Sequence, residues 1–429
     1  MNIGILDHMG YGNLGDAATQ DVVIANIRKR LPDARLVGFS FAPPDTEKRH
    51  GIPCYPIQWW CPVTEKTETT GTSVATRAGL KSRLKSALKK NRSLYSWAIP
   101  VLNLAREMAF WFSSYKRLRK LDLLIISGGG QIDEIWEGPW LQPFTLFKFC
   151  SLAKLARKKL YFLNVGAGPL KHPLSRLFAK WAVNFADYRS FRDKDSETRL
   201  RDLGVKPKTY VFPDLAYGLE IADEWKSLPR NGSKPVVGLN PFRFCHPLLR
   251  PPKEESLYLE YLEKLVQFSS WLLDQGYDLR FFTTDHVNDL SAIQDLKERL
   301  RSSLPSLEFA SRVSGGASES VKDVLQEMSR FEFVITSKYH GIIFAHVLRK
   351  PVISLSYHTK MDAAMEALGQ GSYCADIERF DLRWLTEAFL ALVRDGKNIK
   401  LKSATAVEAN VTMLSKQFDS LLPPQQVRV

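Results

Sequence analysis

Short apolar runs that alternate with amphipathic stretches constrain the fold of this chain more than any other feature. Such alternation predicts an α/β fold with mostly parallel sheets, because parallel neighbours need a crossover connection. The expected strands of the first half are 2–6, 35–39, 122–127, 159–165, 187–191 and 209–212. A helix pattern over roughly 16–31 begins at Asp16 and ends in Arg28, Lys29 and Arg30, charges that suit the helix dipole.

The second half repeats the rhythm. Its expected strands are 236–240, 279–282, 307–309, 333–336 and 351–355, and a long amphipathic helix is expected around 255–274. Residues 225–234, which contain Pro229, Asn231 and Gly232, have the composition of a linker. Since 429 residues exceed one ordinary core, we expect two Rossmann-like domains, 1–225 and 226–429, facing each other across a cleft in a GT-B-like arrangement.

Composition narrows the class of protein. No apolar run approaches the roughly 20 residues that cross a bilayer, and the chain opens on a strand pattern rather than a secretory signal. We therefore expect a cytoplasmic protein. The five cysteines are odd in number and lack CxxC spacing, which argues against a disulfide framework and a structural zinc site and predicts separate reduced thiols.

Positive charge is concentrated in one segment. Residues 77–120 contain twelve Lys or Arg against the single acid Glu107, a net charge of +11 out of +14 for the whole chain. This argues for one local interaction face and against nucleic-acid binding. The segment belongs to a basic insertion at about 62–120 that interrupts the α/β alternation.

Two interpretations of the insertion stay open. Leu80, Leu84 and Leu88 recur at helical spacing among the lysines of 77–92, as in an interfacial helix that docks on anionic lipid. Alternatively, the apolar pattern over 101–118 forms a core helix and the lysines are a solvated face.

Glycine-rich loops follow three expected strands of the first half, where open α/β sheets bind ligands. None of them has the GxGxxG or Walker pattern of nucleotide sites. The loops could approach a ligand closely, or they could only let helices pack. Asp16, at the start of the first helix, could be an N-cap or a catalytic acid. The candidate binding residues are Gly12, Asn13, Gly15, Asp16, Gly128, Gly129, Gly130, Gly166 and Gly168.

The strongest local signal is the segment from Ser337 to His340. An expected buried strand delivers Lys338 and His340 at its carboxyl end, directly before an apolar helix, where packing gives no reason for polar residues. Lys360 follows the next strand. His346 and His358 do not complete a metal-ligand spacing, so no metal is expected.

The motifs taken together resemble the polysaccharide pyruvyl transferase family. Its Gly-Asn-x-Gly-Asp opening matches 12–16, its Gly-Gly-Gly and Gly-x-Gly-Pro loops match 128–130 and 166–169, and its Arg-Asp-x-x-Ser element matches 192–196. Leu203-Gly204-Val205 follows that element, and Pro213-Asp214 resembles the Pro-Asp step of the family. The Ser-Arg-x-His signature corresponds to 337–340 and the Tyr-x-x-Lys element to 357–360. These elements occur in order over about 2–365.

This resemblance implies transfer of a pyruvyl group from phosphoenolpyruvate to a surface glycan or its lipid-linked precursor, without a metal or nucleotide cofactor. His340 is implied as the general acid, and the C-terminal domain as the carrier of the donor site. Donor-binding roles are implied for Ser337, Lys338, Arg192 and Lys360, and Asn240 joins the substrate-binding candidates. A peripheral position on the inner face of the cell membrane would suit a lipid-linked acceptor.

Lys338 departs from the family pattern, which has an arginine there, and lysine cannot make a bidentate fork with a carboxylate or phosphate. Two other functions therefore stay open. The chain could be a GT-B-like glycosyltransferase that uses a nucleotide sugar, or a non-catalytic member of a polysaccharide assembly complex.

Overall fold

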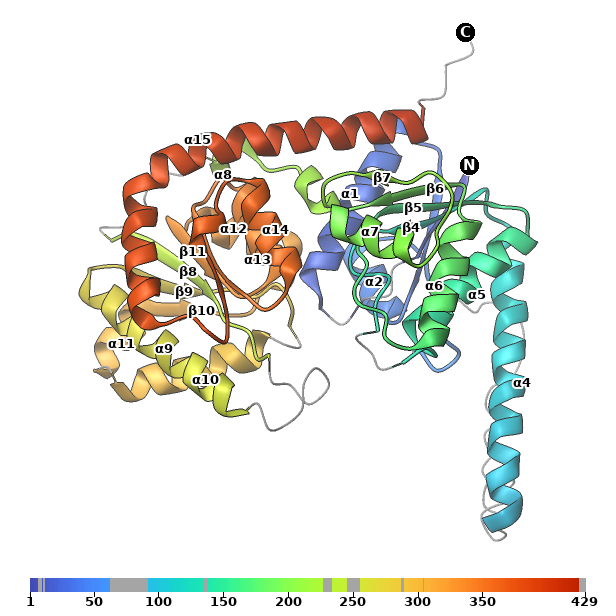
Figure 1. The fold of residues 1–429 in the computed structure, drawn as a ribbon, viewed down its shortest axis with the longest axis horizontal. Coiled ribbons are helices and arrows are strands. Elements are labelled where there is room, and N and C mark those ends of the chain that lie inside the picture. Colours follow the sequence, from blue (N-terminus) through green and yellow to red (C-terminus); the bar gives the residue numbers. More distant parts are fainter. Residues whose placement is uncertain are drawn as a thin grey trace.

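The computed structural model describes residues 1–6, 10, 12–61, 92–134, 138–226, 234–244, 255–286, 289–303 and 305–423. Two parallel sheets with helices on their faces lie side by side, and one long C-terminal helix spans both (Figure 1, red). The α/β class expected from the alternation of strands and helices is confirmed.

The first sheet has seven strands in the order β3-β2-β1-β4-β5-β6-β7, all in parallel pairs. Between β1 and β4 the order reverses, which places a crevice at the carboxyl ends of these strands. The strands are β1 (Asn2–Leu6), β2 (Arg35–Ser40), β3 (Cys54–Pro56), β4 (Leu123–Ser127), β5 (Lys159–Val165), β6 (Tyr188–Phe191) and β7 (Tyr210–Val211). The helices around it are α1 (Leu14–Arg30), α2 (Pro43–His50), α4 (Arg92–Leu118), α5 (Gln142–Leu155), α6 (Pro173–Phe185), α7 (Lys194–Asp202) and η2 (Leu215–Gly218).

The second sheet has six strands in the order β10-β9-β8-β11-β12-β13 and reverses between β8 and β11. Its strands are β8 (Val236–Asn240), β9 (Asp278–Phe281), β10 (Val313–Gly315), β11 (Phe333–Thr336), β12 (Val352–Ser356) and β13 (Cys374–Asp376). Its helices are α9 (Glu255–Asp274), α10 (Asp289–Ser303), α11 (Ser306–Arg312), α12 (Val321–Ser329), α13 (Tyr339–Val347), α14 (Thr359–Ala367) and η4 (Gly371–Tyr373).

The strand expected at 307–309 is wrong, because these residues belong to α11. Three residues that alternate apolar, polar, apolar fit a helix as well as a strand. The true strand β10 starts where α11 ends, at Val313.

Helix α1 starts two residues before the expected Asp16. Asn13 is its N-cap and accepts a hydrogen bond from the backbone N of Asp16 at 3.1 Å. The side chain of Asp16 is therefore not needed to cap the helix and lies buried at the crevice.

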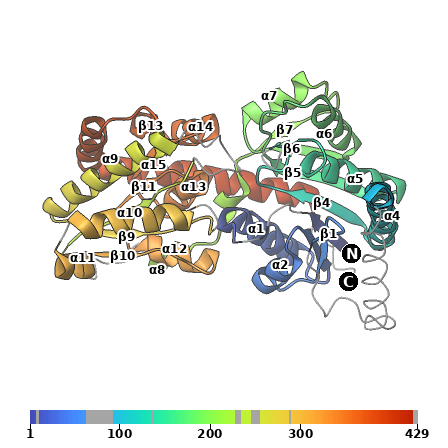
Figure 2. The same ribbon diagram turned by 90° about the horizontal axis from the view of Figure 1, so that it is seen from below.

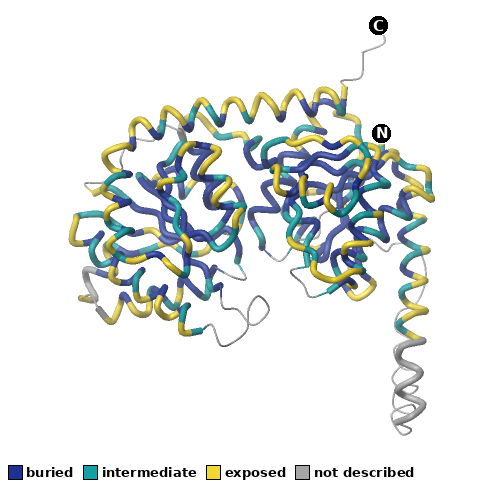
Figure 3. Tube along the Cα trace, in the orientation of Figure 1, coloured by how far each residue is buried: buried dark blue, intermediate teal, exposed yellow. Residues whose placement is uncertain are grey.

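Helix α15 (Leu382–Leu421) begins on the second sheet and ends on the first (Figures 1 and 2). Phe389 lies in the core near its start. At the far end Gln417 Nε2 donates to Asn164 Oδ1 at 2.7 Å, and Arg30 pairs with Asp419 at 2.8 Å. One hydrophobic core cluster contains buried residues of both halves. Figure 3 shows the buried residues of each half in dark blue. The two sheets are thus held in a fixed relation.

The expected domain limits stay a prediction. The boundary at 225 falls within the short helix α8 (Asp223–Lys226), and residues 227–233 of the expected linker lie outside the described residues. Within the described part of the chain, no helix is long and apolar enough to cross a membrane.

Candidate functional site

The two halves meet at the start of α1. Leu14 N donates to Thr284 O at 2.9 Å, and His286 N donates to Gly12 O at 3.2 Å. Gly12 also packs against the His286 ring. The glycine-rich loop after β1 is thus paired with the loop after β9, and this contact brings α1 and α13 together at the centre of the molecule.

His340, in the first turn of α13, lies on Gly15 of α1, and a Cβ atom at Gly15 would stand 1.9 Å from its Nδ1. Its Nε2 is buried and has no hydrogen-bond partner within the described ranges. Burial lowers the pKa of His340, while the charges of Asp214 and Asp16 oppose that shift. The lowered pKa favours the neutral ring, and its Nε2 is available to a ligand.

Asp16 lies on the other side of the same crevice. Its Oδ1 would stand 2.6 Å from a Cβ atom at Gly129, so the glycine leaves room for this carboxylate. Burial raises the pKa of Asp16, and His340 and Arg192 partly counter the shift. A buried carboxylate near a histidine can exchange protons with bound groups.

Arg192 connects the crevice to a pocket. Its guanidinium packs on the backbone of Gly166 and lies 4.6 Å from the ring centroid of Tyr339, across the junction of the two halves. Its Nη1 lies 3.4 Å from Asp214 Oδ2, and its Nε lies 3.5 Å from Asp193 Oδ2. This side chain is largely buried, so its position is fixed from both sides.

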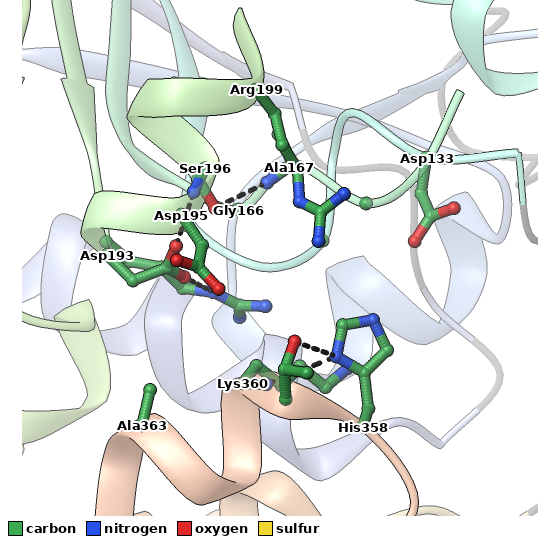
Figure 4. Close-up of a pocket in the computed structure, with 14 residues that line it drawn as sticks. Asp133, Gly166, Ala167, Asp193, Asp195, Ser196, Arg199, His358, Lys360 and Ala363 are labelled. Atoms are coloured by element: carbon green, nitrogen blue, oxygen red, sulfur yellow. Dashed lines mark hydrogen bonds and ion pairs between the residues drawn. The ribbon is translucent and has the colours of Figure 1, made fainter. Parts of the chain in front are cut away.

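A narrow pocket opens beside Arg192, between α7 of the first half and α14 of the second (Figure 4). The N-termini of both helices face it, and such ends attract anions through unpaired N–H groups and the helix dipole. Its interior volume is about 40 Å³, a space suited to one small anionic molecule and too narrow for a sugar ring. Its lining includes Gly130, Gly166, Gly168, Arg192, Lys360, Asp133, Asp195, Arg199 and His358.

Positive charge enters this pocket from both halves. Arg199 reaches into it from α7, and Lys360 lies opposite, on α14 (Figure 4). Lys360 Nζ lies 5.8 Å from the ring centroid of Tyr339. Neither cation forms an ion pair with another residue of the described chain. Together with Arg192 they can bind a phosphate and a carboxylate at once.

His358 caps α14 at the edge of the pocket. Its Nδ1 accepts a hydrogen bond from Lys360 N at 3.2 Å, which assigns the proton of the neutral ring to Nε2. Burial, together with the charges of Lys360 and Arg192, lowers the pKa of His358 to about 4. The ring is thus a neutral donor at pH 7.

Asp133 faces the same space from the loop after β4. Its Oδ2 would stand 2.1 Å from a Cβ atom at Gly168, so the carboxylate rests on that backbone. Burial raises the pKa of Asp133, and Lys360 and Arg192 counter the shift. A carboxylate with a raised pKa at the rim of an anion pocket is a candidate base for a hydroxyl group.

Lys338 is not among the residues that line this pocket. Its Nζ lies 3.1 Å from Asp285 Oδ2 and 3.3 Å from Asp289 Oδ1. Burial lowers the pKa of Lys338, but the two carboxylates raise it above its ordinary value. The lysine therefore compensates charge inside the C-terminal half, and its implied role in donor binding stays a prediction that this geometry does not favour.

Ser337 and Asn240 also have partners within the C-terminal half. Ser337 Oγ lies 2.9 Å from Tyr261 Oη, and Asn240 Nδ2 donates to Asp289 at 3.0 Å. Thr336 Oγ1 donates to Asn240 Oδ1 at 3.0 Å. Both side chains brace the ends of β8 and β11, and their substrate-binding roles stay predictions.

The structure therefore divides the expected residues into groups. Arg192, Lys360, Gly130, Gly166 and Gly168 line the pocket, whereas His340, Gly15, Asp16 and Gly129 form the adjoining crevice. Gly128 instead packs on Thr19 of α1, and Asn13 serves as helix cap.

Sequence reasoning missed Asp133, Arg199 and His358. Asp133 and His358 follow strand ends, a position that could have identified both. Among the described residues, no group of His, Cys, Asp and Glu side chains could hold a metal ion.

Comparison with known families agrees with the motifs. The model of the polysaccharide pyruvyl transferase family matches residues 13–359, most of the chain. No protein of curated function matches significantly by sequence.

Several solved structures share the fold. HepE of Anabaena, solved with UDP, matches with a TM-score of 0.55 at 16% identity, covering 98% of each chain. The UDP-GlcNAc 2-epimerase of Neisseria meningitidis matches with a TM-score of 0.56 at 13% identity, covering 98% of this chain and 99% of its own. The corresponding epimerase of Methanocaldococcus jannaschii has a TM-score of 0.54 at 11% identity, covering 91% and 92%. At such identities the likeness shows a shared GT-B-like fold alone.

Proposed function

The chain belongs to the polysaccharide pyruvyl transferase family, and we propose that it transfers a pyruvyl group from phosphoenolpyruvate to two hydroxyls of a glycan or its lipid-linked precursor. The product is a pyruvate ketal. The observation that carries the proposal is the pocket between α7 and α14, where two helix N-termini and the cations Arg192, Arg199 and Lys360 converge. Phosphoenolpyruvate offers two anionic groups to such a site.

The proposed reaction balances without an added acid, base or oxidant. Carbon 3 of the donor gains a proton, and its carbon 2 becomes oxocarbenium-like. Two sugar oxygens form bonds to carbon 2, and the bond from carbon 2 to the phosphate oxygen breaks. Of the two hydroxyl protons, one replaces the proton given to carbon 3 and the other leaves with hydrogen phosphate. No resident cofactor is required.

His340 is the proposed proton donor to carbon 3. It must be protonated to act, although burial lowers its pKa. The charges of the bound donor stabilise the imidazolium form and thus raise that pKa. Donor binding and activation of the acid are therefore coupled.

Carboxylates supply the complementary bases. Asp16 lies near His340 and can return a proton to it, whereas Asp133 lies at the pocket wall beside Lys360. Both have pKa values raised by burial, which brings them closer to the range in which a carboxylate accepts and releases protons. Because the pocket is too small for a sugar ring, the glycan would approach at its rim, where Asp133 lies. We therefore propose that Asp133 accepts the proton of the attacking hydroxyl.

The test follows inorganic phosphate released from phosphoenolpyruvate in the presence of candidate glycans. Release that needs both a glycan and His340 supports the proposal, and the His340→Ala variant is the control. Because related folds are solved with UDP, a parallel assay offers nucleotide sugars. Turnover of a nucleotide sugar, with no phosphate release from phosphoenolpyruvate in the presence of any glycan, would replace pyruvyl transfer by glycosyl transfer.

A further inference from the structure

Helix α4 extends away from the N-terminal half (Figure 1, cyan), and its C-terminal end packs on that half. Near that end, Phe110 and Leu118 are buried. Glu107 Oε1 accepts a hydrogen bond from the buried Lys148 Nζ at 2.8 Å and another from Trp111 Nε1 at 2.8 Å. One face of α4 is therefore fixed on the N-terminal half.

An exposed face of the same helix carries an apolar stripe. Leu104, Met108 and Phe112 recur every fourth residue and expose 63%, 58% and 61% of their surface. Figure 3 shows how much of this helix is exposed. The interpretation of 101–118 as a core helix is therefore wrong for Leu104, Met108 and Phe112, which are exposed. Large apolar side chains that line up in solvent mark an interaction surface.

A cation continues the stripe. Lys116, one turn after Phe112, places its Nζ 4.3 Å from the centroid of that ring. The only acid of α4, Glu107, is turned inward to Lys148. A second copy of this surface would bring like charges together, whereas an anionic surface would complement it.

We propose that the stripe Leu104, Met108 and Phe112 docks on an anionic lipid bilayer. Apolar side chains enter the boundary between headgroups and acyl chains, and Lys116 beside Phe112 suits the headgroup level. Residues 77–91 of the earlier candidate helix lie outside the described residues, so α4 carries the argument. This inference rests on the proposed function in one respect, since a membrane surface would present a lipid-linked acceptor.

Co-sedimentation of the full chain with vesicles tests the surface. Vesicles of phosphatidylcholine with phosphatidylglycerol are compared with vesicles of phosphatidylcholine alone. The wild type should bind the anionic vesicles, less so at high salt, and the variant Leu104→Gln/Met108→Gln/Phe112→Gln should bind about tenfold more weakly. The matched control Leu155→Gln/Leu390→Gln/Leu401→Gln alters side chains that expose 67%, 48% and 69% on other helices and should bind like the wild type.

Equal binding by the stripe variant and the wild type would overturn the proposal. So would a wild type that sediments as a dimer while the stripe variant is monomeric, since a second copy would then cover the stripe. Vesicle binding is measured without turnover, and phosphate release with a soluble glycan is measured without vesicles. Failure of one proposal is therefore distinguishable from failure of the other.

Discussion

The imidazole of His340 lies on the backbone of Gly15, so close that a Cβ atom there would stand 1.9 Å from Nδ1. The two residues come from different halves of the molecule. Position 15 of the Gly-Asn-x-Gly-Asp motif must therefore be a glycine, because the ring of His340 occupies the space of a side chain there. This contact gives a physical reason for both motifs to occur in one chain.

A methyl group at Gly15 should displace the ring without unfolding the protein, because a side chain can turn away and alanine favours a helix. We expect Gly15→Ala to lower kcat about 10²- to 10⁴-fold, as loss of a general acid does, with little change in Tm. The control is Gly396→Ala in α15, where a Cβ atom meets its nearest neighbour at 3.7 Å. Steady-state phosphate release measures both, and full activity of Gly15→Ala would contradict the role of His340.

The state of His340 predicts a pH profile. Since burial lowers its pKa below 6.5, kcat/KM, which reports the free enzyme, should fall as pH rises through a value below 6.5. Once the donor is bound its charges raise this pKa, so the fall in kcat should come at higher pH.

Asp16→Asn sharpens the test. The carboxylate of Asp16 favours the imidazolium, so its loss should move the fall in kcat/KM to still lower pH. The surface variant Asp419→Asn should leave the profile in place. If the pH profile of kcat/KM does not move in Asp16→Asn, Asp16 does not influence the pKa of the general acid His340.

Local patterns reveal the sheets but not the pocket. Buried parallel strands are short apolar runs, so most were predictable, whereas β3 and β13 at the sheet edges, Cys54–Pro56 and Cys374–Asp376, lack such runs. Arg199 and Lys360 become neighbours only when the two halves pack together. Lys338 looked like a donor ligand because Asp289, its buried partner, is 49 positions away in the sequence.

Lys338 should contribute to stability more than to donor binding. Lys338→Met leaves the fully buried Asp289 carboxylate without its cation, a change that costs about 3–5 kcal/mol in unfolding free energy. In urea denaturation, the double variant Lys338→Met/Asp289→Asn should lose less than the sum of the single losses. A stable Lys338→Met protein with a strongly raised KM for phosphoenolpyruvate would instead return the lysine to the donor site.

Arg199 should bind the donor without taking part in proton transfer. It reaches into the pocket from α7 and forms no ion pair with another described residue, so its removal should leave the fold intact (Figure 4). A hydrogen bond to a charged group contributes about 1.5–3 kcal/mol, so Arg199→Gln should raise the KM for phosphoenolpyruvate about 10- to 100-fold. The profile of kcat against pH should keep its shape, because His340 is unchanged. The matched control is Arg176→Gln on the exposed side of α6, which should leave KM as it is. An unchanged KM in Arg199→Gln would show that the donor anions bind elsewhere and would remove the pocket between α7 and α14 from the donor site.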